Sequence, residues 1–305
     1  MTRFLVSGLI NIETTLRIER FPLDYNPVNF PFFGIQSSVS GVGYNLAKAL
    51  TRLGNEVEFL SLIGGDDAGR LVRHALQRDG LPMRGILESL EQTPQSVILY
   101  DSQGRRQIHA DLKDIQERDY PPEQAMQALA ACEVAVLCNI HFSRPLLVQA
   151  HRLGKPIATD VHAIGDLEDE YNRDFMQFAD ILFMSHERLP LPPEEWLQAL
   201  MARYPARLVV IGLGERGCLL GERKAGQVSH VLVPAVNTRA VQNTIGAGDA
   251  LFAAFLHAYF RGDSAITALR KAVVFASYKI GAVSAADGFL DGAELEELYR
   301  QVFSL

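Results

Sequence analysis

The chain has 305 residues, of which 48% are hydrophobic and 21% are charged, and its formal net charge is −7. This length and composition fit a globular protein with a large buried core and argue against disordered or fibrous classes. The acidic balance argues against nucleic acid as the main partner, although backbone amides can still bind a small anion locally. Three cysteines are too few for a disulfide framework, and none has the Cys-x-x-Cys spacing typical of zinc sites.

No targeting or membrane segment is visible in the sequence. The apolar start at residues 4–10 is too short for a signal peptide and lacks a small-residue cleavage site. The longest apolar run, residues 250–260, lies between Asp249 and Arg261 and is too short to span a bilayer. We therefore expect a cytoplasmic protein with reduced cysteines and no membrane association.

Segments typical of strands and of helices alternate along most of the chain. In chain order, the expected strands lie at residues 4–7, 57–62, 134–137, 156–159, 181–184, 208–211 and 228–233. The expected helices with the clearest boundaries lie at residues 43–53, 68–78, 246–260, 264–281 and 292–302. Helical segments of crossover length also separate the four central strands. This alternation predicts an α/β fold with a mostly parallel sheet covered by helices on both faces.

Two stretches interrupt this alternation. Residues 13–34 are rich in proline and aromatic side chains and show no helical period. Residues 93–109 indicate a hairpin with its turn at residues 101–104. We expect both to form a small β-layer that projects from the main sheet as a lid, although an ordinary edge extension is an alternative. No linker divides the chain. We therefore predict one domain, residues 1–305, whose lid comprises about residues 11–36 and 93–112.

The strongest chemical signal is the heptapeptide Asn-Thr-Ile-Gly-Ala-Gly-Asp at residues 243–249, directly before an apolar helix. A turn at Gly246, Ala247 and Gly248 leaves backbone N–H groups free at a helix start, where the helix dipole also favours an anion. Asp249, in the first turn, can accept the proton of a hydroxyl that attacks a phosphoryl group held there. The alternative is that Asp249 only complements the dipole and the glycines only make a tight turn.

This heptapeptide resembles the C-terminal signature of the PfkB/ribokinase family of carbohydrate and nucleoside kinases. Three further segments resemble motifs of that family and occur in the family's order. They are Gly-Leu-Ile-Asn-Ile-Glu at 8–13, Ser-Gly-Val-Gly-Tyr-Asn-Leu-Ala at 40–47 and Gly-Leu-Gly-Glu-Arg-Gly at 212–217. A single Gly-Ala-Gly-Asp is a weak signal, but the ordered set covers nearly the whole chain. The resemblance implies a three-layer α/β/α ribokinase-like fold with a central mostly parallel sheet and a small projecting β-lid.

The resemblance also implies roles for individual residues. Asp249 would be the catalytic base, ATP with Mg²⁺ the phosphoryl donor, and the amides of Gly246, Ala247 and Gly248 the anion hole. The residues implied around the acceptor are Asn11, Glu13, Gly41, Val42 and Asn45. The residues implied beside the nucleotide are Ser185, Leu213, Gly214, Gly217 and Asn243. No residue is predicted as a direct metal ligand, and Asn11 or Gly41 could instead serve local backbone geometry. Arg105 and Arg106 are interpreted as solvated lid residues.

Several positions depart from the family pattern. Glu13 replaces the usual Asp and reshapes the acceptor pocket, and Val42 replaces the Lys of ribokinases, which argues against ribose as the substrate. Asn243 replaces an Asp near the phosphate or monovalent-cation region, so activation by K⁺ stays open. Ser185 and Arg188 take the Asn and Glu positions of the family's Asn-x-x-Glu element, which helps to organise magnesium and phosphates.

We therefore predict an ATP-dependent kinase that phosphorylates a hydroxyl of a small sugar or sugar-like molecule. A nucleoside kinase is an alternative, because an aromatic base could stack on Phe30, Phe32, Phe33 or Tyr44. A catalytically weak ligand-binding protein is a second alternative suggested by the departures, although the retained Asp249 argues against it. We also expect a homodimer that pairs through the exposed lid.

Overall fold

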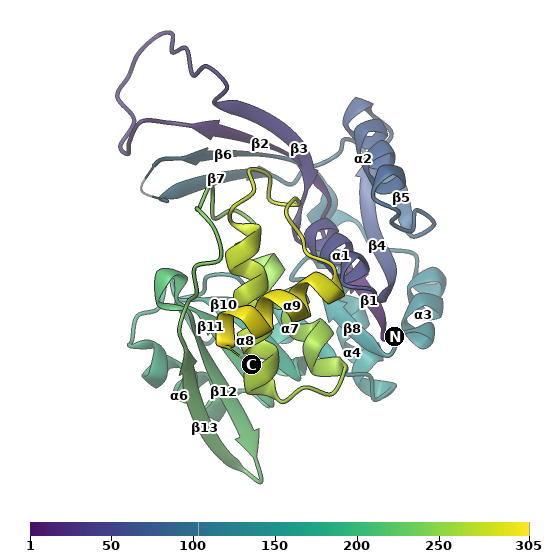
Figure 1. Cartoon of the computed structure of the whole chain (residues 1–305). Coiled ribbons are helices and arrows are strands. Elements are labelled where there is room, and N and C mark those ends of the chain that lie inside the picture. Colours follow the sequence, from purple (N-terminus) through teal and green to yellow (C-terminus); the bar gives the residue numbers. More distant parts are fainter. Residues whose placement is uncertain (103, 305) are drawn as a thin grey trace.

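The computed structural model describes residues 1–102 and 104–304, which form a large sheet, a small sheet and two layers of helices (Figure 1). In spatial order, the large sheet contains β13 (Gln227–Val233), β12 (Cys218–Lys224), β11 (Leu208–Gly212), β10 (Ile181–Ser185), β9 (Ile157–Asp160), β8 (Val134–Leu137), β1 (Arg3–Ser7), β4 (Glu56–Gly64) and β5 (Ile86–Leu90). All neighbours pair in parallel except β11 with β12 and β12 with β13, which are antiparallel. The predicted mostly parallel sheet is confirmed.

Helices cover both faces of the large sheet. One core, on one face, includes residues of α1 (Val42–Arg52), α2 (Asp67–Arg78), α7 (Ala247–Phe260), α8 (Ala265–Lys279) and α9 (Gly292–Phe303). The other core includes residues of α3 (Pro122–Ala131), α4 (Arg144–Arg152), α5 (Arg173–Phe178) and α6 (Pro193–Arg203). Successive residues of β1 alternate between the two cores, with Phe4 and Val6 in the first and Leu5 in the second. Burial on both faces explains why the strands are continuous apolar runs.

The small sheet has the order β3 (Ile35–Ser40), β2 (Asn11–Arg17), β6 (Gln95–Tyr100) and β7 (Arg106–Asp111). Figure 1 shows it standing beyond the helix layer at one end of the large sheet. The expected hairpin is confirmed as the antiparallel pair β6 and β7, while Gln103 of its predicted turn lies outside the described residues. The proline-rich segment 18–34 forms a long connection without strands.

Short local signals set the ends of the helices near the site. Asp66 is the N-cap of α2, and its side chain accepts a hydrogen bond from the Gly69 amide at 2.9 Å. The structure also contains short 3-10 turns, η1 (Ile115–Glu117), η2 (His141–Ser143) and η3 (Gly214–Arg216). Across residues 1–102 and 104–304, every helix is too short or too polar to cross a bilayer.

Candidate active site

The N-terminus of α7 is built around Gly246. This residue caps the helix in a left-handed conformation, with φ of 75°. A Cβ here would lie 2.6 Å from the carbonyl oxygen of Ala285, so the close approach of two backbone segments requires glycine. The turn places Asp249 in the first turn of the helix, where a carboxylate complements the dipole.

The predicted anion hole consists of the amides of this turn. The Ala247 amide already donates to the Thr244 carbonyl oxygen at 3.2 Å. Within the described part of the chain, the Gly246 and Gly248 amides have no hydrogen-bond partner. A Cβ on Gly248 would meet no atom within 4 Å outside its own stretch of helix, so there is open space beside Gly248. Gly246 and Gly248 are therefore better placed than Ala247 to receive an anion.

Asn45 holds the Asp249 carboxylate. Its Nδ2 donates to Asp249 Oδ2 at 2.7 Å, although the two residues are 204 positions apart. α1 begins directly after Gly41, which has φ of 107° and whose Cβ would lie 2.5 Å from the Leu9 carbonyl oxygen. Gly43 packs so closely against Gly8 that its own Cβ would lie 2.5 Å from the Gly8 carbonyl carbon. These glycines bring the start of α1 against the end of β1 and so aim Asn45 at Asp249.

The surroundings of Asp249 change its acidity. Burial raises the pKa of the Asp249 carboxyl group, and the negative charge of Asp160 adds to this effect. The hydrogen bond from Asn45 and the charges of His162 and Lys279 act in the opposite direction. A carboxyl group with a raised pKa is a better proton acceptor once ionised, which suits a general base.

A polar cluster on the small sheet faces the same carboxylate. Ser40 donates to Glu13 Oε2 at 3.1 Å and also contacts Asn45 Oδ1 at 3.4 Å, and Asn11 Nδ2 donates to Ser96 Oγ at 2.9 Å. Among the described residues, the buried Asn11 Oδ1 and Glu13 Oε1 have no hydrogen-bond partner. Buried oxygens without partners are costly, so they indicate a ligand that brings hydroxyl donors. Val42, also predicted here, packs against the core.

Burial also perturbs Glu13. Loss of solvation raises the pKa of its carboxyl group to about 6, and the charge of Asp249 adds to this, while Ser40 and Lys279 oppose it. Glu13 and Asp249 therefore disfavour each other's ionised forms. A substrate hydroxyl that donates to Glu13 would stabilise its ionised form and relieve part of this cost.

Replacing Glu13 by glutamine is expected to stabilise the free protein at pH 8 more than at pH 4.5. The pKa of Glu13 rises from 4.5 to about 6 on folding, so the folded state favours the protonated carboxyl group. That stabilisation is present below pH 4.5 and is lost as the pH rises through 6. The difference in the free energy of unfolding between Glu13→Gln and wild type should therefore grow by about 2 kcal/mol between these pH values.

Urea unfolding of both proteins at the two pH values measures this difference. Glu123→Gln, on the exposed start of α3, is the control and should show no such growth. An unchanged difference between pH 4.5 and pH 8 for Glu13→Gln would contradict a raised pKa at this position.

The predicted nucleotide residues lie apart from this cluster, at the ends of neighbouring strands. Ser185 ends β10 and pairs in register with Gly212, the last residue of β11. Leu213, Gly214 and Gly217 follow in the tight turn before β12, where Gly214 has φ of 61° and Gly217 has φ of 98°. Carboxyl ends of parallel strands are the usual binding edge of an α/β sheet.

Asn243, also predicted beside the nucleotide, is buried, and its side chain makes hydrogen bonds to backbone groups. Its Nδ2 donates to the Val283 carbonyl oxygen at 2.6 Å, and its Oδ1 accepts from the Ile245 amide at 2.6 Å. The side chain therefore fastens the heptapeptide to the loop after α8. An aspartate could make only the second of these contacts, because an ionised carboxylate has no donor.

Two features of the small sheet were missed from the sequence. Arg106 of β7, expected to be solvated, donates to Thr244 Oγ1 at 3.3 Å and to Glu187 Oε1 at 3.2 Å. Ile98 of β6 is buried together with Ile245 and Ala285. The small sheet thus rests on the anion-hole turn. Only the approach of segments far apart in sequence reveals these contacts.

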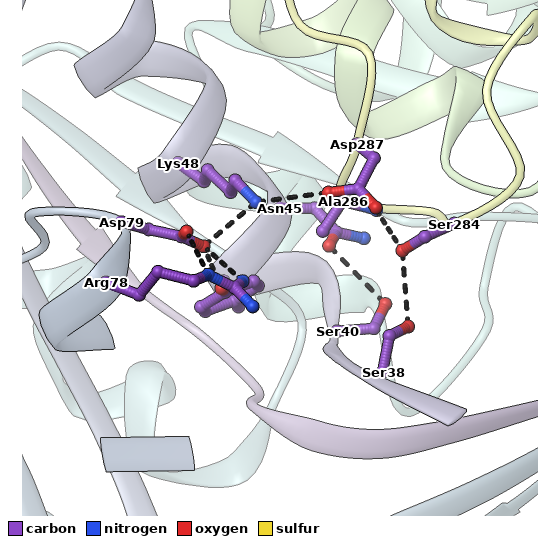
Figure 2. Close-up of polar contacts among 10 residues, drawn as sticks. Ser38, Ser40, Asn45, Lys48, Arg78, Asp79, Ser284, Ala286 and Asp287 are labelled. Carbon is purple, nitrogen blue, oxygen red and sulfur yellow. Dashed lines mark hydrogen bonds and ion pairs between the residues drawn. The ribbon is translucent and has the colours of Figure 1, made fainter. Parts of the chain in front are cut away.

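A network between α1, α2 and the loop after α8 borders the polar cluster (Figure 2). Lys48 Nζ lies 2.9 Å from Asp79 Oδ2 and 3.3 Å from Asp287 Oδ1, and Ser38 Oγ lies 3.2 Å from Ser284 Oγ. A cavity of about 490 Å³ opens here along the β3 edge. Its charged groups are already paired, so the polar cluster at Asp249 is the stronger candidate for the acceptor site.

The prediction that Tyr44 belongs to the aromatic side chains of the lid is wrong. It is fully buried in α1, and its hydroxyl group donates to Asp79. Phe30, Phe32 and Phe33 are exposed on the long connection between β2 and β3, which Figure 1 shows extending beyond the small sheet. The structure therefore offers no aromatic contact for a base at Tyr44.

The fold is similar to that of several solved kinases. The microbiome-derived acarbose kinase Mak1 has a TM-score of 0.85 and 25% sequence identity, with 98% of each chain covered. Arabidopsis thaliana ribokinase, solved with ribose and ATP, has a TM-score of 0.78 and 19% identity, with 98% of this chain and 99% of its own covered. This likeness shows the fold alone. The fold is therefore the predicted three-layer ribokinase-like α/β/α fold.

The sequence comparisons identify the family. The model of the pfkB family carbohydrate kinases matches residues 1–291. A fructokinase from Klebsiella pneumoniae is 30% identical over 236 residues, which cover 71% of this chain and 75% of that protein. A ribokinase from Bacillus subtilis is 27% identical over 273 residues, covering 86% and 88%. The chain belongs to the pfkB family of carbohydrate kinases and is an ATP-dependent phosphotransferase that acts on a sugar.

Proposed function

We propose that Asn11, Glu13, Asn45 and Asp249 bind the acceptor sugar and that Asp249 removes the proton from its reacting hydroxyl. The observation that carries this proposal is the pair of buried oxygens without partners, Asn11 Oδ1 and Glu13 Oε1. Two acceptors beside a carboxylate match neighbouring hydroxyl groups of a sugar, because each hydroxyl can donate one hydrogen bond.

The residues around Asp249 have separate roles in the proposed reaction. Asn45 orients the carboxylate, so that its other oxygen can face the hydroxyl. The amides of Gly246 and Gly248 stabilise negative charge on the transferred phosphoryl group. The nucleotide would lie along the ends of β10 and β11, beside Ser185, Leu213, Gly214 and Gly217, with its terminal phosphate towards the start of α7.

Magnesium fits this site chiefly as a partner of the nucleotide. Within residues 1–102 and 104–304, no group of three or more His, Cys, Asp or Glu side chains is arranged to hold a metal ion. Mg²⁺ in kinases is commonly held by phosphate oxygens and waters with one or two carboxylates. When bound, it would neutralise phosphate charge.

The small sheet is proposed to act as a lid. Arg106, Ile98 and Ser38 already connect it to Thr244, to the Ile245 region and to the loop after α8. Closure over the acceptor would exclude water and limit hydrolysis of ATP. β7 is exposed along its whole length at the edge of this sheet, which favours pairing with a second copy as a homodimer.

A sugar is favoured over a nucleoside as the acceptor. The cluster is polar, and Phe30, Phe32 and Phe33 lie on the connection between β2 and β3 and not on the elements that carry Asp249 or Asn45. Replacement of the ribokinase lysine by Val42, which packs against the core, argues further against ribose.

Release of ADP from MgATP, measured against a panel of sugars and nucleosides, tests this assignment. At least one sugar should raise the rate of ADP release well above the acceptor-free rate, and nucleosides should not. A rate that depends only on nucleosides would replace the sugar assignment. A rate that no acceptor raises would overturn the proposed acceptor site.

A further inference from the structure

Lys279 is a buried charge that the proposed mechanism does not use. It is the last residue of α8 and its side chain is completely buried. Its Nζ donates to the carbonyl oxygen of Ile245, the residue directly before the N-cap of α7. Burying an ammonium group costs free energy unless the group has partners, so the position of Lys279 requires a physical reason.

Charged groups of the candidate active site act electrostatically on Lys279. Burial lowers the pKa of its ammonium group to about 8, while the carboxylates of Asp249, Glu13 and Asp287 raise it and Arg239 lowers it. The group therefore stays mostly protonated at neutral pH. It supplies positive charge to a region in which two buried carboxylates, Glu13 and Asp249, disfavour each other.

Two backbone carbonyl groups beneath the anion hole receive donors from side chains of this chain. The Ile245 carbonyl accepts from Lys279, and the Val283 carbonyl accepts from Asn243 Nδ2 at 2.6 Å. Backbone carbonyl oxygens are the ligands that K⁺ prefers in proteins. Here one such oxygen is already bound by an ammonium group, and an amide replaces the carboxylate that a neighbouring cation would neutralise.

We propose that the ammonium group of Lys279 is a built-in monovalent cation that positions the start of α7 and makes turnover independent of added K⁺. This inference rests on the proposed function of Asp249 and the anion hole. Lys279 acts through Ile245 and the field at Asp249 and touches neither substrate, so it is a positioning residue. Without it, the carbonyl of Ile245 and the two carboxylates would be left for an external cation to satisfy.

A merely structural role is the rival explanation, and Lys271 provides the matched control. It lies two turns earlier on α8 and is also buried, with Nζ at 2.8 Å from Asp263 and 2.5 Å from Glu296. Lys271→Met removes a buried ammonium group from the same helix, but its partner Asp263 follows the end of α7 opposite to the anion hole. It should lower the melting temperature without changing the response of kcat to cations.

The experiment compares wild type, Lys279→Ala, Lys279→Met and Lys271→Met in choline chloride, replaced stepwise by KCl or NH₄Cl at constant ionic strength. Both kcat for ADP release and the melting temperature are measured. Wild type should not respond to either cation in either measurement. Lys279→Ala should lose about 100-fold in kcat in choline, and K⁺ or NH₄⁺ should restore most of it. Lys279→Met should not be restored, because its side chain fills the space.

The melting temperature of Lys279→Ala should likewise rise with K⁺ or NH₄⁺ and not with choline. Three results would each overturn the inference: wild type that needs K⁺, Lys279→Ala that keeps full kcat in choline, or a loss of kcat in Lys279→Ala that neither K⁺ nor NH₄⁺ reverses. If Lys279→Ala does not fold, the response of wild type to KCl decides alone. If no acceptor raises ADP release, the acceptor assignment fails, but the melting temperatures still test the cation site.

Discussion

Asp249→Asn is expected to lower kcat by about 10²–10⁴-fold, because an amide cannot take the proton of the acceptor hydroxyl. The substitution conserves shape, and the Oδ1 of the new amide can still accept from Asn45 Nδ2, which now lies 2.7 Å from the carboxylate. Burial raises the pKa of Asp249, so removal of its charge should leave stability at neutral pH unchanged or improved. Steady-state ADP release and a thermal melt measure the two effects.

Asp263→Asn provides the opposite pattern as a control. Asp263 follows the end of α7 and accepts a hydrogen bond from Lys271 Nζ at 2.8 Å, outside the candidate active site. Its replacement should lower the melting temperature and leave kcat unchanged. An Asp249→Asn protein with wild-type kcat would remove this residue from the chemistry and leave it with the helix dipole alone.

Two kinds of regularity made the fold predictable from the sequence. The strands of the large sheet are buried on both faces, so each is a continuous apolar run that stands out between helices. The short glycine motifs mark places where two backbones meet closely. Gly41, Gly43 and Gly246 all have backbone atoms of another segment where a Cβ would stand, and this is why the motifs that contain them also carry the site.

The remaining parts of the site depend on contacts that sequence patterns do not encode. Lys279 stands at the end of a helix, where a lysine usually points to solvent and complements the dipole. Its actual partner, Ile245, lies 34 positions away. Arg106 donates a hydrogen bond to Thr244, which lies 138 positions later in the chain, although all residues of its strand β7 are exposed. Charge and exposure give no signal for either contact until the loop after α8 and the small sheet are placed.

The structure gives a physical reason for asparagine at position 243, where the family pattern has aspartate. As an aspartate it would need a cation or a second donor to approach the Val283 carbonyl, whereas the amide makes that contact directly at 2.6 Å. The Asn243 amide and the Lys279 ammonium group therefore each donate to a backbone carbonyl around one turn. The structure does not explain the departures from the family pattern at Ser185 and Arg188, although Glu187 beside them is bound to Arg106.

Gly248→Ala is expected to separate binding of the phosphoryl group from stability. A Cβ at Gly248 would meet no protein atom within 4 Å, and alanine favours a helical position over glycine by about 1 kcal/mol. The variant should therefore fold at least as well as wild type. We expect the same Cβ to hinder the approach of the transferred phosphoryl group to the Gly246 and Gly248 amides, so kcat should fall by about 100-fold.

Thermal melts and steady-state kinetics on the same preparations measure both effects of Gly248→Ala. Gly65→Ala is the matched control, because its Cβ would meet only Glu88 Oε2 at 3.8 Å, at the end of β4 and away from α7. It should change neither kcat nor the melting temperature appreciably. A Gly248→Ala protein that turns over normally would mean that the phosphoryl group does not approach this turn. A fully inactive but destabilised protein would instead make Gly248 a packing residue, since loss of activity would then follow loss of the fold.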